Sequence, residues 1–111
     1  MPTETAQHSH PAPLGTAAAP MGEAFAAFDD AVFNGPGEIP RVYRELVALA
    51  VALTTQCDAC LKGHAKAAVA HGATEEQLAE VTYITAALRA GGGIVHGMKA
   101  LSAVRSLLPQ G

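Results

Sequence analysis

Apolar residues recur at intervals of three and four along most of this chain, and this spacing limits what the chain can fold into. Between residues 38 and 54 they form one stripe, made of Ile39, Val42, Leu46, Leu49 and Leu53. This spacing places side chains on one face of an α-helix, whereas a half-buried strand requires strict alternation of apolar and polar residues. No segment shows convincing alternation, so the sequence predicts an all-α fold.

The helical spacing predicts a compact bundle of about five helices. The predicted helices cover about residues 21–33, 38–54, 56–71, 74–90 and 94–107. Pro40 is tolerated in a first helical turn, and Gly72 suits a left-handed helix end. Thr74 and Gln77 have the spacing of a capping box, in which each side chain bonds to the backbone of the other residue. Gly91-Gly92-Gly93 is expected to break the chain before the last helix.

Residues 1–20 are expected to form a flexible arm, which leaves one helical domain over residues 21–111. The arm combines Pro, Ala, Thr and Ser with a single large aliphatic residue, Leu14, and this is too little apolar surface to order it. In the whole chain 50% of the residues are apolar and only 15% are charged. So high an apolar fraction in 111 residues suggests that another subunit covers part of the surface.

Charge and hydropathy exclude two classes of partner. The net charge is −3 and the seven Lys and Arg residues are scattered, so no nucleic-acid partner is expected. The longest apolar run, residues 46–53, is far shorter than the roughly 20 residues that a membrane span needs. Residues 1–20 contain no Lys or Arg and show no signal peptide, so a cytoplasmic protein is expected.

Both cysteines of the chain lie close to a histidine, as Cys57, Cys60 and His64. If a helix begins near Gln56, the three side chains fall at i, i+3 and i+7 and share one face. A thiol in the first turn of a helix lies in the field of unpaired backbone N–H groups, and a neighbouring imidazole can take its proton. The motif therefore predicts a redox-active or nucleophilic dithiol with its own base.

Glu45 lies at the edge of the apolar stripe on the preceding helix, an unusual place for a carboxylate. One interpretation is a surface ion pair with Arg41 or Arg44, which would contribute little. The other is a partly buried carboxylate that orients or charges His64. The sequence leaves both interpretations open.

Other histidines offer weaker chemistry, and neither a metal nor a cofactor is expected. A closed zinc site needs four ligands, and only three candidate ligands cluster here, all on one helix. His8 and His10 form a possible metal-binding pair, but in a flexible arm they are more simply solvated. His96 follows the three glycines, where it is either a surface residue or a group that reaches a neighbouring subunit's site.

The arrangement of Glu45, then eleven residues, then Cys57-x-x-Cys60-x-x-x-His64 resembles the carboxymuconolactone decarboxylase-like family and its alkylhydroperoxidase (AhpD-like) branch. The resemblance covers roughly residues 21–108. It implies a thiol-dependent hydroperoxide reductase or disulfide reductase. In this role Cys60 attacks the peroxide, Cys57 resolves the product to a disulfide, His64 is the general base and Glu45 orients His64.

The resemblance also implies partners. These are a small hydroperoxide as substrate, a lipoyl-like or thioredoxin-like dithiol as reductant, and further copies of the chain in a homotrimer or homohexamer. One residue departs from the family pattern, because the best-known peroxidase members have a histidine where this chain has Ala59. The proton relay is therefore expected to be shorter.

Two other functions remain open. One is a non-enzymatic redox sensor or assembly module, whose disulfide state changes an interface. The other is a lactone decarboxylase, a branch that generally lacks the C-x-x-C pair, so Cys57 and Cys60 argue against it.

Overall fold

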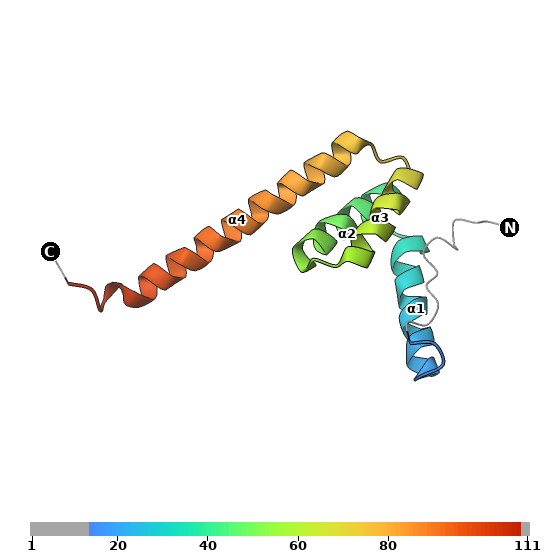
Figure 1. Cartoon of the computed structure of the whole chain (residues 1–111), viewed down its shortest axis with the longest axis horizontal. Coiled ribbons are helices and arrows are strands. Elements are labelled where there is room, and N and C mark those ends of the chain that lie inside the picture. Colours follow the sequence, from blue (N-terminus) through green and yellow to red (C-terminus); the bar gives the residue numbers. More distant parts are fainter. Residues whose placement is uncertain (1–13, 110–111) are drawn as a thin grey trace.

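The computed structural model describes residues 14–109, and all regular structure within that range is helical. The helices are α1 (Ala19–Asn34), α2 (Arg41–Thr55), α3 (Asp58–Ala70) and α4 (Glu75–Arg105) (Figure 1). The predicted all-α fold is confirmed. The predicted arm over residues 1–20 falls mostly outside the described residues, as do His8 and His10.

Three helices form the body of the molecule: α2, α3 and the first half of α4. Its core contains Leu46 from α2, Ala68 from α3 and Ala73 from the following turn. Val42, Leu78 and Val81 pack against this cluster from its edge. Small side chains such as Ala68, which has no exposed surface, allow α3 to lie close to α2.

Residues 14–109 form four helices rather than about five, because α4 continues through the three glycines. The predicted break at Gly91-Gly92-Gly93 is therefore wrong. Glycine lowers helix stability by about 1 kcal/mol per residue relative to alanine. It keeps its backbone N–H, however, so it does not end a helix as proline does. The predicted start of this helix is confirmed, because Thr74 and Gln77 form both bonds of a capping box.

The third helix begins two residues later than predicted. Gln56 has a φ of 56° and is the left-handed C-cap of α2, so it cannot also begin α3. Cys57 has extended backbone and is the N-cap of α3. The two cysteines therefore lie at the start of the helix, as expected, but only Cys60 lies within its first turn.

The second half of α4 extends away from the body (Figure 1). The molecule measures 73 × 39 × 26 Å and has a radius of gyration of 19.6 Å, whereas a compact domain of 100 residues has about 13 Å. In a single chain, therefore, only the body has the predicted compact packing, and the second half of α4 lies outside it. Among residues 14–109 no helix is both long enough and apolar enough to cross a membrane.

Candidate functional site

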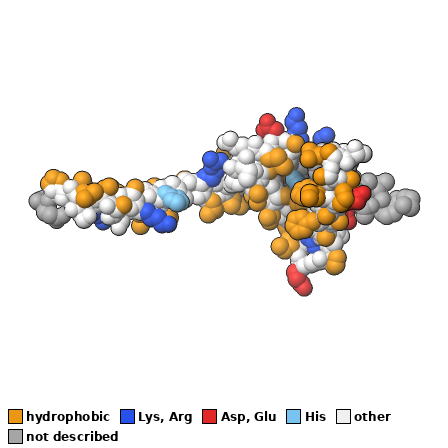
Figure 2. Space-filling model, turned by 90° about the horizontal axis from the view of Figure 1, so that it is seen from below, with side chains coloured by type: hydrophobic (Ala, Val, Ile, Leu, Met, Phe, Trp, Pro, Cys, Tyr) orange, Lys and Arg blue, Asp and Glu red, His pale blue; other side chains and the backbone are white. Residues whose placement is uncertain are grey.

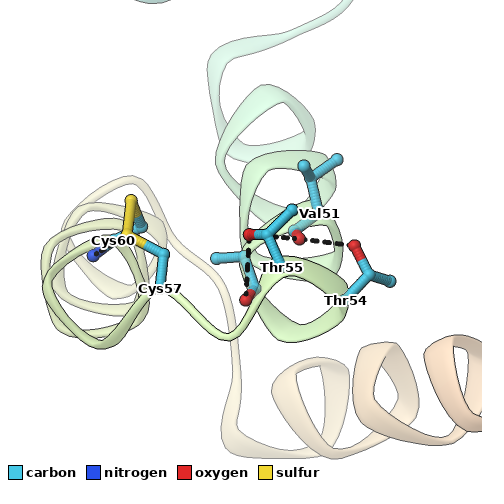
Figure 3. The surroundings of a disulfide bond; sticks show 6 residues. Val51, Thr54, Thr55, Cys57 and Cys60 are labelled. Carbon is cyan, nitrogen blue, oxygen red and sulfur yellow. Dashed lines mark hydrogen bonds between the residues drawn. A yellow bond between two sulfur atoms is a disulfide. The ribbon is translucent and has the colours of Figure 1, made fainter.

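A disulfide joins Cys57 and Cys60 at the beginning of α3. The backbone N–H of Cys60 also donates to the sulfur of Cys57 over 3.4 Å, so the N-cap sulfur accepts from one of the unpaired N–H groups of the helix. Figure 3 shows the pair beside the end of α2, where the hydroxyls of Thr54 and Thr55 donate to the carbonyl of Val51. The dithiol motif thus lies between the end of one helix and the start of the next.

Glu45 is fully buried, and each of its carboxylate oxygens meets a polar partner. Its Oε1 lies 2.7 Å from Nδ1 of His64, and its Oε2 accepts from Nε of Arg41 over 3.0 Å. Glu45 thus pairs with both Arg41 and His64, but the interpretation as a surface ion pair is wrong because the carboxylate is buried. Arg44 does not pair with Glu45, because its guanidinium donates to the backbone carbonyls of residues 32, 35 and 39.

The contact with Glu45 sets the hydrogen-bonding roles of the two ring nitrogens of His64. An ionised carboxylate can only accept, so the proton of a neutral His64 lies on Nδ1. The lone pair of that ring is then on Nε2, which is the atom that can take a proton from another group. A base oriented by a buried carboxylate in this way is one common means of activating a nucleophile.

His64 and Cys60 line the same open pocket, which has a volume of about 300 Å³. The other lining residues are Phe33, Ala48, Val51, Ala52 and Thr55. The centroid of the Phe33 ring lies 4.8 Å from that of His64. The pocket therefore offers a mostly apolar wall beside a sulfur atom and an imidazole.

The structure brings together all four residues that the sequence singled out. Cys60 and His64 share the pocket, Glu45 lies behind His64, and Cys57 is bonded to Cys60. Their chemical roles stay predictions. Sequence reasoning missed Phe33 and Asn34 at the end of α1, because a contact across the α1–α2 connection follows no helical spacing.

The other two described histidines lie outside this pocket. His71 is the C-cap of α3, and its backbone N–H donates to the carbonyls of Ala67 and Ala68. His96 is exposed on the second half of α4. A part for His96 in a neighbouring subunit's site stays a prediction.

The fold and the site define a small all-helical protein with a dithiol–disulfide pair at a helix start and a carboxylate–histidine pair behind it. A family model described as "Carboxymuconolactone decarboxylase family" matches residues 19–103. The chain belongs to the carboxymuconolactone decarboxylase family, which includes the alkylhydroperoxidase-like branch.

Two bacterial relatives are similar to the chain. A protein of Paracoccus denitrificans, named "Uncharacterized protein 4 in cox locus", is 41% identical over 86 residues, which cover 78% of this chain and 77% of the relative. An uncharacterized protein of Cupriavidus necator is 41% identical over 66 residues, covering 60% of this chain and 58% of the relative. Neither name assigns an activity.

Proposed function

We propose that this protein is a thiol-dependent hydroperoxide reductase. The observation that carries the proposal is the joint placement of Cys60 and His64 on one apolar pocket, with Glu45 bonded to Nδ1 of the imidazole. Membership of the carboxymuconolactone decarboxylase family and the Cys57–Cys60 disulfide fit a redox role. Because the pocket wall is mostly apolar, we expect a hydroperoxide with an organic group rather than a strongly charged one.

The reaction consumes one dithiol and one hydroperoxide. The Cys60 thiolate attacks the terminal oxygen, the O–O bond breaks, and the products are a Cys60 sulfenic acid and an alcohol whose proton comes from His64. The thiol of Cys57 then attacks the sulfenic sulfur, water leaves, and the disulfide forms. An external dithiol reduces that disulfide through a mixed disulfide and is itself oxidised. Such a cycle fits a reducing compartment such as the cytoplasm.

The test uses cumene hydroperoxide as substrate and dithiothreitol as reductant. Cys60→Ser should abolish peroxide consumption, because the attacking sulfur is lost. Cys57→Ser should still react once and leave a sulfenic acid that dimedone traps. Full activity in Cys60→Ser would remove the proposal. No turnover in the unmodified protein, with an oligomer size that differs between reduced and oxidised protein, would favour the redox sensor instead.

We also propose that the partner of α4 is a second copy of this chain. Apolar side chains are exposed along the second half of the helix, and Figure 2 shows hydrophobic atoms distributed along this projection. Those more than half exposed in this part of the helix are Ile94, Val95, Met98 and Leu101. Ile94, Met98 and Leu101 lie at i, i+4 and i+7 and form one apolar face, and such a face of a helix is normally buried against a partner.

Charge favours α1 of another copy as one surface that covers α4. After Glu80, the charged residues of α4 are Arg89, Lys99 and Arg105, all basic. Those of α1 are Glu23, Asp29 and Asp30, all acidic. Helix α1 also exposes apolar side chains, among them Phe25 and Phe28. An α1–α4 contact between copies would bury apolar surface and pair opposite charges, and it fits a homotrimer or homohexamer as well as a dimer.

A further inference from the structure

We infer that Arg41 and Asn34 are positioning residues of the site, which act on the imidazole of His64 through the carboxylate of Glu45. The inference rests on the proposed function for its catalytic consequence, but its structural content can be tested without any turnover. Its basis is a continuous series of side-chain hydrogen bonds that starts at the end of α1 and ends at His64.

The series begins with Asp30, whose Oδ1 accepts from Nδ2 of Asn34 over 2.6 Å. Since Asn34 donates through its nitrogen, its Oδ1 is left to accept from Nη1 of Arg41. Arg41 in turn donates from Nε to Oε2 of Glu45. The remaining carboxylate oxygen of Glu45 meets Nδ1 of His64. Each bond thus fixes which atom the next residue presents.

The guanidinium of Arg41 holds the Glu45 carboxylate by its planar geometry as well as by its charge. Nε and Nη1 are held in one plane and bind partners on two different helices, Glu45 on α2 and Asn34 on α1. A lysine ammonium is a compact charge on a flexible stem and does not reproduce this planar pair of donors. Arg41 therefore fixes the rotation of the Glu45 carboxylate, so that Oε1 points at Nδ1 of His64.

The predicted consequence concerns the tautomer of His64. With Glu45 held, the proton stays on Nδ1 and the lone pair on Nε2. With Arg41 removed, the carboxylate can rotate and the preference for one tautomer weakens. Two further carboxylates belong to the elements packed here, Asp30 at the start of the series and Asp58 in the first turn of α3, and no residue lining the pocket comes from α4.

The experiment measures the ¹⁵N signals of His64 by NMR. It also measures the single-turnover rate at which reduced protein reacts with cumene hydroperoxide. The unmodified protein should show the Nδ1–H tautomer. Arg41→Met and Arg41→Lys should show a mixture, and the rate should fall about tenfold, which is less than the 100-fold or more expected when a general base is lost. Asn34→Leu should change the tautomer in the same direction if Arg41→Met fails to fold.

Arg44→Met is the matched control. Arg44 lies one turn further along α2 and binds backbone carbonyls at the α1–α2 connection, so its loss should lower stability and leave the His64 tautomer unchanged. An unchanged tautomer in folded Arg41→Met and Asn34→Leu would overturn the inference. If the variants change the tautomer but the unmodified protein consumes no peroxide, the inference is supported and the proposed function is contradicted.

Discussion

Nδ1 of His64 lies 2.7 Å from Oε1 of Glu45, a carboxylate with no exposed surface. The two residues are 19 positions apart and belong to different helices, α2 and α3. Burying a carboxylate is costly unless charged or polar partners surround it. Glu45 therefore links the packing of the two helices to the orientation of the imidazole in the pocket.

Replacing Glu45 with alanine should destabilise the protein strongly. The substitution leaves the donors of Arg41 and His64 without their buried acceptor, and breaking a buried charged cluster costs about 3 kcal/mol or more. Urea unfolding should show this as a lower midpoint. Glu38→Ala, at an exposed position, is the control and should stay within about 0.5 kcal/mol of the unmodified protein. A similar loss of stability in both variants would contradict this prediction, because the buried contacts of Glu45 would then add nothing to the stability of the protein.

Thr74→Ala should remove the capping box at the start of α4. The Thr74 hydroxyl accepts from the backbone N–H of Gln77 over 3.1 Å, and loss of such a cap costs about 1 kcal/mol. The urea midpoint should fall without a change in the slope of the transition. Thr82→Ala tests a threonine inside the same helix, beyond its first turn, whose hydroxyl donates to the carbonyl of Leu78. Because alanine has the higher helix propensity, Thr82→Ala should cause no loss, and an equal loss there would contradict the capping argument.

Local patterns and tertiary contacts were not equally predictable from the sequence. The stripe around Leu46 and the cap at Thr74 depend on residues three or four positions apart, so the helices and the start of α4 could be predicted. The continuation of α4 through Gly92 could not, because weak propensity does not decide whether a helix ends. The residues of the site also differ in how far the sequence predicts them. The C-x-x-C motif reveals Cys57 and Cys60, whereas the bond from Arg41 to Asn34 depends on how the α1–α2 connection folds.

Gly92→Ala should stabilise α4. A Cβ at this position meets no atom within 4 Å, and its φ is not in the left-handed region. Alanine should therefore add up to about 1 kcal/mol of helix stability, measured by thermal unfolding. Gly72→Ala is the contrasting variant, because Gly72 has a φ of 105° and a side chain there should destabilise. A loss of stability in Gly92→Ala would show that another surface approaches the glycines closely.

Assembly through α4 should be visible by analytical ultracentrifugation. The protein should sediment as an oligomer, and Met98→Lys should shift it toward the 11.3 kDa monomer by placing a charge in the proposed interface. Thr82→Lys, which adds the same charge near the body, should have a smaller effect. Added salt should weaken the assembly, because it screens the opposite charges of α1 and α4. A monomer at all concentrations, with or without Met98→Lys, would refute the proposed interface.

The most direct test of the central claim is a thiol titration of the reduced protein, with peroxide consumption measured at each pH. The claim is that Cys60 at the helix start, beside His64, is an activated thiol. Its pKa should therefore lie below the ordinary cysteine value of about 8.5. Peroxide consumption should rise with the same midpoint, and this titration should be absent from Cys60→Ser. An ordinary pKa for Cys60, with a rate that does not follow its ionisation, would contradict the account.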